Sequence, residues 1–292
     1  MMSGFDGRTI VKATFDEAAD ILGQDLWAMI NGSDADIIGQ TVNTQPIMLA
    51  AGVATYRAYL EAGGKTPAAV AGHSLGEYTA LVAADALSFA DAVRLVHLRA
   101  ELMQTAVPQG AGAMAAVLGL EDEQVKALCA TAAQGEVVEA VNFNSPGQVV
   151  IAGHASAVER AMNAAKEAGA KRALPLPVSV PSHCSLMKPA AEKLAEALQS
   201  VKIDRPKIRV IHNADVASYD DAEKIKDALV RQLYSPVRWT ETVNALVSDG
   251  LTESAECGPG KVLAGLAKRI NKEAVCTALT NIEQVTAFVE TH

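Results

Sequence analysis

A serine flanked by glycines is the sharpest chemical signal in the sequence, in the segment Gly72-His73-Ser74-Leu75-Gly76. Gly-x-Ser-x-Gly between a strand and a helix lifts a nucleophilic hydroxyl out of a sheet. The backbone N–H of Leu75 lies at the predicted helix start, where it can face a developing oxyanion. We interpret Ser74 as a candidate nucleophile, and the simpler alternative is a tight turn with a capping serine.

A serine nucleophile needs a general base, and the chain has six histidines. Four are poor candidates because they adjoin the serine, lie on an amphipathic helix, lie in a predicted turn or end the chain: His73, His97, His154 and His292. His183 and His212 remain. We favour His183, because it follows an irregular segment where the chain would leave an inserted lobe and enter a cleft. Hydrolases of the usual α/β type place an acid and then a histidine after the serine, and the lack of a suitable histidine after His212 weakens that alternative.

Arg99 is a candidate for binding an anionic group. It follows Ser74 by 25 residues, on a helix that Ser88 could cap, with Asp91 three residues later. A guanidinium can hold a carboxylate through two parallel hydrogen bonds. Taken alone, however, an arginine on such a helix is usually a surface residue.

The elements that must position these residues form two predicted units. In residues 108–177, strands and helices follow the ferredoxin-like order βαββαβ, which predicts a small inserted domain. The flanking residues 1–107 and 178–292 alternate helices with short apolar strands, which predicts a hydrolase-like α/β domain with a parallel sheet. Helices are expected at 14–30, from 45 to 63 and after the serine turn; strands are expected at 67–71, 208–211 and 254–256.

Composition excludes several protein classes. The chain has 292 residues, of which 50% are hydrophobic and 20% charged, so it is neither disordered nor collagen-like. A net charge of −9 and only 4% aromatic residues argue against nucleic-acid binding. The four cysteines form no C-x-x-C pair and predict free thiols in a reducing cytoplasm.

Neither a membrane span nor a signal peptide is expected. The longest charge-free runs considered, 37–56 and 102–120, are interrupted by polar residues, proline or glycines. Neither run is a continuous apolar segment of the length that a bilayer requires. The N-terminus lacks the basic start and the apolar stretch of an export signal.

Several motifs occur together, in order, from about Thr14 to the C-terminus. They are Gly72–Tyr78, the helix with Arg99, Val141–Gln148, Pro181-Ser182-His183, Gln232–Val237 and Gly258-Pro259-Gly260. In this combination the chain resembles the malonyl-CoA–acyl carrier protein transacylase family. The resemblance implies ping-pong acyl transfer, in which Ser74 carries the malonyl group and His183 is the base.

The same resemblance assigns further residues. Arg99 would pair with the free malonyl carboxylate. The histidine of the family is oriented by a backbone carbonyl, and Gln232 occupies the matching position. Three residues would line the cleft or the acyl site: Asn142, Asn144 and Ser182. Malonyl-CoA and acyl carrier protein are the implied partners, and neither a metal nor another cofactor is expected.

Two regions bear on these expectations. The family begins with a strand and a Gly-Gln-Gly-Ser-Gln segment that completes the oxyanion hole; no segment here matches it, which predicts a late start or a truncated chain. Residues 171–209 carry eight bases and three acids, so we expect them to dock the acidic carrier, with Lys188 and Arg205 as candidates. The alternatives to a transferase are a serine esterase or thioesterase, and an impaired, truncated copy that only binds.

Overall fold

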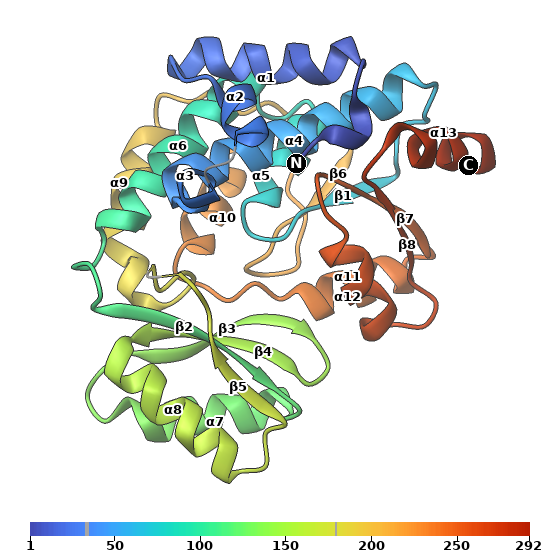
Figure 1. Cartoon of the computed structure of the whole chain (residues 1–292). Helices are drawn as coiled ribbons and strands as arrows, with labels where there is room; N and C mark the ends of the chain where they lie inside the picture. Colours follow the sequence, from blue (N-terminus) through green and yellow to red (C-terminus); the bar gives the residue numbers. More distant parts are fainter. Residues whose placement is uncertain (33–34, 179) are drawn as a thin grey trace.

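The computed structural model describes residues 1–32, 35–178 and 180–292. Figure 1 shows a small antiparallel unit (β2–β5 with α7 and α8) beneath a larger, mainly helical part that holds both chain ends. The chain enters the small unit after α6 and returns from it before α9. This arrangement confirms the expected α/β fold with a βαββαβ insertion.

The helices belong mostly to the larger part. The α-helices are α1 Thr9–Leu22, α2 Leu26–Asn31, α3 Ala35–Gly39, α4 Thr41–Glu61, α5 Gly76–Ala83, α6 Phe89–Thr105, α7 Asp122–Ala133, α8 Ala155–Glu167, α9 Lys188–Leu198, α10 Ala222–Gln232, α11 Trp239–Ser248, α12 Val262–Ile270 and α13 Ile282–Thr291. Two short 3₁₀ helices are η1 Ser3–Phe5 and η2 Ser185–Met187. Ser88 caps α6 as expected, because its Oγ accepts a hydrogen bond from the backbone N–H of Asp91 at 3.0 Å.

The strands form separate parallel and antiparallel sheets. They are β1 Ala69–Ala71, β2 Gly112–Leu118, β3 Val138–Ser145, β4 Gln148–His154, β5 Arg172–Pro175, β6 Arg209–Ile211, β7 Glu253–Cys257 and β8 Val275–Leu279. In the described residues β1 pairs in parallel with β6, and β7 with β8, a strand that the sequence analysis did not include. The small unit has the order β3-β4-β2-β5, with every neighbouring pair antiparallel.

Each unit has its own apolar core. In the small unit, α7 and α8 pack buried side chains such as Val125 and Val158 against Val117 and Ile151 of the sheet. The larger core gathers α1, α4, α5, α6, α9 and α10 around residues such as Phe15 and Leu81. Ala115 and Val117 of β2 both join the core of the small unit, because alternate residues of a strand point to the same face.

The N-terminal helices differ from expectation. The single helix predicted over 14–30 is two helices, because Gly23 adopts a left-handed φ of 66° and ends α1. Asp25 then caps α2 by accepting a hydrogen bond from the Ala28 N–H at 2.8 Å. The second predicted helix corresponds to α4, which begins at Thr41 rather than near residue 45, so Pro46 lies inside it. The prediction from apolar spacing alone extended the first helix past Gly23, because it gave no weight to a glycine that ends the helix.

The two parts are joined along β3. The backbone N–H of Phe143 donates to the Val237 carbonyl at 3.0 Å, and the Val237 N–H donates to the Val141 carbonyl at 2.8 Å. A second connection comes from Glu139, whose carboxylate accepts hydrogen bonds from the backbone N–H and hydroxyl of Ser185. These contacts place β3 beside the segment that carries His183. In the described part of the chain, no helix is both long and apolar enough to cross a bilayer.

The turn between β1 and α5 depends on Gly72. A Cβ atom at Gly72 would lie 1.9 Å from the backbone carbon of Gly76, whereas a Cβ at Gly76 would meet nothing within 4 Å. Backbone cannot yield as a flexible side chain does, so an alanine at position 72 must open the turn.

We therefore expect Gly72→Ala to lower the free energy of unfolding by about 3 kcal/mol or more. Gly76→Ala is the matched control and should stay within about 1 kcal/mol of the parent. Urea unfolding followed by circular dichroism measures both. Equal stability of the two variants would contradict the role assigned to Gly72.

Candidate active site

Ser74 lies in a strained turn at the end of β1. Its φ is 51°, in the left-handed region that residues other than glycine seldom adopt. The turn is closed by hydrogen bonds from the N–H groups of Gly76 and Glu77 to the carbonyls of His73 and Ser74. The N–H of Leu75 precedes these groups at the positive end of α5, as an oxyanion donor should. The structure thus has the predicted strand–turn–helix geometry at the serine.

The structure brings His183 to the serine from the other side of the insertion. Ser74 Oγ lies 2.7 Å from His183 Nε2, and His183 Nδ1 lies 2.8 Å from the backbone carbonyl of Gln232. A carbonyl can only accept, so Nδ1 carries the ring proton, and the unprotonated Nε2 accepts from the serine hydroxyl. His183 is therefore oriented as a general base for Ser74.

Burial keeps this imidazole neutral. His183 is 3% exposed, and desolvation together with the charge of Arg99 lowers its pKa to about 3. Its backbone φ of 65° is also left-handed, and its N–H donates to the Leu233 carbonyl at 3.0 Å. Two strained residues that face one another are typical of a functional site, where the surrounding structure holds them in place.

Arg99 is buried at the same site. The side chain is 1% exposed, and Nη2 lies 3.1 Å from Ser74 Oγ and 3.0 Å from Gln232 Oε1. Nη1 donates to Gln45 Oε1 at 2.7 Å, and the guanidinium lies over the Tyr78 ring. The alternative interpretation of Arg99 as a surface residue is therefore wrong, and its guanidinium points to Ser74 Oγ.

His212, the other candidate base, contacts Glu77 rather than Ser74 among the described hydrogen bonds. Its Nδ1 lies 2.7 Å from Glu77 Oε1, and both side chains are fully buried. The neighbouring Asn213 receives the Ser74 N–H on Oδ1 and donates from Nδ2 to the Gly72 carbonyl, each at 2.7 Å. Sequence reasoning missed Asn213, Glu77 and Gln45. The signal for Asn213 was a polar residue shortly after β6, the strand that pairs in parallel with β1.

The remaining predicted residues lie at different depths around the site. Asn144 Oδ1 accepts from His73 Nε2 at 2.8 Å, which turns the His73 ring away from the serine. Asn142 is buried on β3, where its backbone forms a parallel bridge with Val237. Ser182 is half-buried, next to His183. None of the three has a contact to Ser74 among the described hydrogen bonds.

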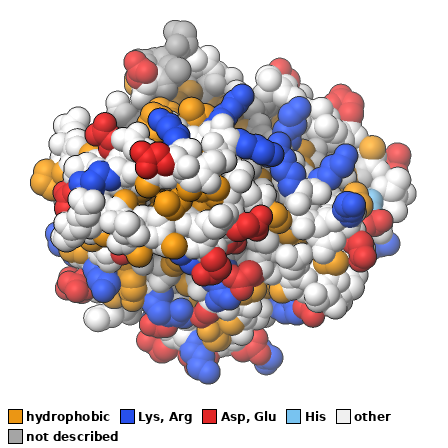
Figure 2. All heavy atoms as spheres, turned by 90° about the horizontal axis from the view of Figure 1, so that it is seen from below, with side chains coloured by type: hydrophobic (Ala, Val, Ile, Leu, Met, Phe, Trp, Pro, Cys, Tyr) orange, Lys and Arg blue, Asp and Glu red, His pale blue; other side chains and the backbone are white. Residues whose placement is uncertain are grey.

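Half of the eight bases in the stretch 171–209 form ion pairs with acids. Four of its cations pair with acids, in the ion pairs Lys202–Asp204, Arg205–Asp220, Lys207–Asp85 and Arg209–Asp249. Arg205 is therefore a weaker docking candidate than expected. Lys188 lies against the Tyr234 ring at the start of α9 and remains a candidate. Figure 2 shows basic side chains gathered at the upper right of the face seen from below, with acidic ones interspersed elsewhere.

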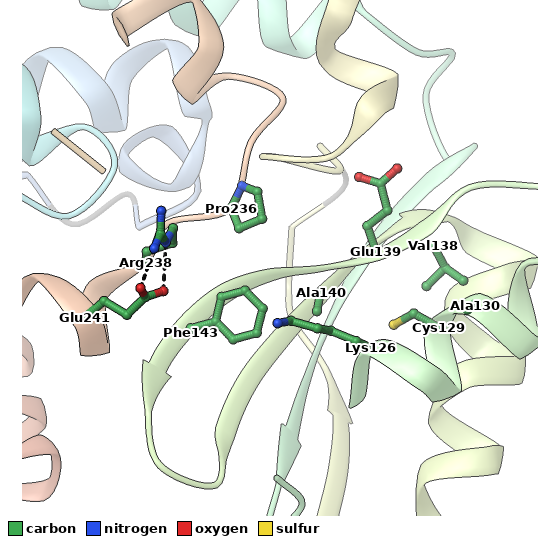
Figure 3. Close-up of a pocket in the computed structure, with 10 residues that line it drawn as sticks. All are labelled: Lys126, Cys129, Ala130, Val138, Glu139, Ala140, Phe143, Pro236, Arg238 and Glu241. Carbon is green, nitrogen blue, oxygen red and sulfur yellow. Dashed lines mark hydrogen bonds and ion pairs between the residues drawn. The ribbon is translucent and has the colours of Figure 1, made fainter. Parts of the chain in front are cut away.

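A pocket of about 500 Å³ lies between the two parts of the molecule. Figure 3 shows its lining, with Lys126 beside Phe143 on one side and the Arg238–Glu241 ion pair on the other. Neither Ser74 nor His183 is among the residues that line it. The candidate pair of Ser74 and His183 is recognised by its hydrogen-bond geometry rather than by the size of this pocket.

Comparison with known proteins agrees with this geometry. Residues 12–287 match the family model of the acyl transferase domain. The malonyl CoA-acyl carrier protein transacylase of Escherichia coli (strain K12) is 54% identical over 281 residues, covering 96% of this chain and 91% of that protein. The acyl-carrier-protein S-malonyltransferase structure from Burkholderia pseudomallei 1710b is 54% identical with a TM-score of 0.97, covering 99% of this chain and 94% of that one.

A further similar structure contains a malonyl-transacylase in complex with its type II PKS acyl-carrier protein. It is 49% identical with a TM-score of 0.96 and covers 100% of this chain and 97% of that chain. The family model and the curated relatives both span nearly the whole length of the sequence. The chain therefore belongs to the acyl transferase family, within the group of malonyl CoA-acyl carrier protein transacylases.

Proposed function

We propose that this protein transfers a malonyl group from coenzyme A to the phosphopantetheine thiol of acyl carrier protein, as part of fatty-acid synthesis. The observation that carries the proposal is one oxygen with two partners: Ser74 Oγ lies 2.7 Å from His183 Nε2 and 3.1 Å from Arg99 Nη2. A base and a cation at one hydroxyl suit a nucleophile that attacks an acyl group with a charged end. The names of the similar proteins supply the substrate class.

In the first half-reaction, His183 Nε2 takes the serine proton as Oγ attacks the thioester carbonyl. The Leu75 N–H stabilises the oxyanion, and its collapse breaks the C–S bond; the departing sulfur receives the proton from His183. In the second half, His183 removes the proton of the carrier thiol, and the thiolate attacks the Ser74 ester. The serine oxygen leaves and regains its proton, so the enzyme is restored.

Arg99 would select the acyl group in this scheme. A malonyl carboxylate can pair with the buried guanidinium, whereas an acetyl group leaves that cation without an anionic partner. Asn142, Asn144, Gln232 and Ser182 would shape the cleft around the acyl chain. We further propose that residues 108–177 form an inserted domain, which their separate core supports. The free cysteines fit a cytoplasmic location, which we propose as well.

Acyl-enzyme formation tests the proposal directly. With malonyl-CoA alone, we expect a burst of about one equivalent of free coenzyme A, followed by a slow phase, because the ester waits for a thiol. Mass spectrometry should place the malonyl group on Ser74, and Ser74→Ala should show no burst. Adding carrier protein should restore turnover. Sustained release of malonate without an acceptor would instead identify a hydrolase.

Removal of the cation tests the role of Arg99. We expect Arg99→Ala to lower kcat/KM for malonyl-CoA by about 10²-fold, the effect of losing a charge-assisted hydrogen-bond pair, and to leave acetyl-CoA much less affected. Arg94→Ala is the matched control, because Arg94 lies on the same helix but its side chain is exposed and paired with Asp91. If both substrates lost activity equally in Arg99→Ala, Arg99 would not be the selecting group.

The lowered pKa of His183 predicts an unusual pH dependence. Because this pKa is about 3 instead of 6.5, the base stays neutral as pH falls from 8 to 5. The rate at which a fluorophosphonate labels Ser74 should therefore not decrease around pH 6.5, where an ordinary histidine would become protonated. Over the same range the unfolded chain takes up a proton on this histidine and the folded chain does not, so stability should fall below pH 6.5. A labelling midpoint near 6.5 would refute the assigned environment.

A further inference from the structure

Glu77 is a buried acid beside the catalytic serine that the reaction does not itself use. It lies in the first turn of α5 and is fully buried. Its Oε1 lies 2.7 Å from His212 Nδ1, and its Oε2 accepts from the Asn213 backbone N–H at 2.9 Å and from Gln232 Nε2 at 3.0 Å. Three donors from two other segments of the chain thus converge on one carboxylate.

The contact with Gln232 fixes which way that side-chain amide points. Gln232 Nε2 donates to Glu77 Oε2 and to the Ser74 carbonyl at 2.9 Å, so the amide oxygen must face the opposite direction. There it accepts from Arg99 Nη2 at 3.0 Å. A carboxylate has only acceptor oxygens, so it holds the amide in this one orientation. Glu77 therefore contacts the same side-chain amide that contacts Arg99.

The contact with Asn213 holds the serine turn. The Asn213 side chain bonds both the Gly72 carbonyl and the Ser74 N–H, on either side of His73. Its backbone N–H is anchored on Glu77, so the asparagine cannot shift without breaking that bond. The left-handed φ of Ser74 needs such support, because this conformation is disfavoured by sterics.

The partners of Arg99 explain why a more distant acid matters. In the described part of the chain, the groups that accept from its guanidinium are neutral: Gln45, Gln232 and the Ser74 hydroxyl. A buried cation without a direct carboxylate partner is costly, unless a counter-charge lies nearby. Glu77 is placed to supply that charge through one intervening amide, without itself occupying a guanidinium N–H.

We propose that Glu77 is a positioning residue that aligns Arg99 through Gln232 and supports the Ser74 turn through Asn213, and thereby sets selectivity for a carboxylated acyl group. The inference rests on the proposed function of the site. Glu77, which directly follows the Gly72–Gly76 motif, thus has a role in specificity. His212 donates to its other carboxylate oxygen, Oε1.

The test compares malonyl-CoA with acetyl-CoA in Glu77→Gln. The amide that replaces the carboxylate carries no negative charge, so it holds Gln232 less firmly and leaves Arg99 without its nearby counter-charge. We expect kcat/KM for malonyl-CoA to fall by about 10²-fold and the malonyl-to-acetyl ratio to fall by at least about tenfold. Fluorophosphonate labelling of Ser74 should also slow, because the turn is less firmly held.

Thr55→Val is the control for a change in stability alone. Thr55 is fully buried in α4, and its hydroxyl donates only to the Ala51 carbonyl among the described contacts. This variant should lose stability and keep the parent selectivity ratio. A folded Glu77→Gln with an unchanged ratio would overturn the inference. If the parent enzyme transferred no malonyl group, the proposed function would fail instead.

A second pair of variants covers the case in which Glu77→Gln does not fold. In His212→Asn the side-chain NH₂ can replace Nδ1–H as the donor to Glu77, whereas His212→Leu removes the donor. We expect a near-parent selectivity ratio in the asparagine variant and a reduced ratio in the leucine variant. Equal ratios in the two variants would contradict the proposal, because the two side chains are similar in size and only asparagine can donate to Glu77.

Discussion

The hydrogen bond between Ser74 Oγ and His183 Nε2 is the contact on which the site depends. It joins two residues that come from opposite sides of the inserted unit, and each has a left-handed backbone. Neither conformation is favourable by itself, so both must be held by neighbours. The Gly72 turn and Asn213 hold the serine, while the carbonyls of Gln232 and Leu233 hold the imidazole and the backbone of His183.

The end of α10 connects these supports. Gln232 uses its backbone carbonyl to fix the His183 tautomer and its side-chain amide to contact Ser74, Glu77 and Arg99. One residue therefore links His183, Ser74 and Arg99. The Gln232 carbonyl orients the imidazole, as the acidic third member of a serine triad does. Unlike that acid, the carbonyl carries no charge and cannot neutralise an imidazolium. Burial that keeps His183 neutral is consistent with that choice.

Much of this was predictable from the sequence, for identifiable physical reasons. Local signals sufficed for the serine turn, the cap at Ser88 and the βαββαβ order, because each depends on residues close together in the chain. Arg99 shows the limit: it shares a helical face with Leu95, Val96 and Met103, all buried, and helical spacing already pointed it inward. The charge of the Arg99 side chain predicted a surface position. The side chain is buried instead, because it donates hydrogen bonds to residues distant in the sequence, such as Gln45 and Gln232.

Contacts between segments distant in the sequence explain the features that local sequence patterns could not predict. Val237 bridges to β3 and Glu139 binds Ser185, and these contacts between distant segments set the position of the base relative to the insertion. A sequence motif identifies a histidine, but only such contacts determine which histidine reaches the serine. His212 illustrates the point, since it is as buried as His183 and lies close by in the fold, yet its Nδ1 is committed to Glu77. What distinguishes a base from a support here is therefore the partner of each ring nitrogen, which depends on the tertiary fold.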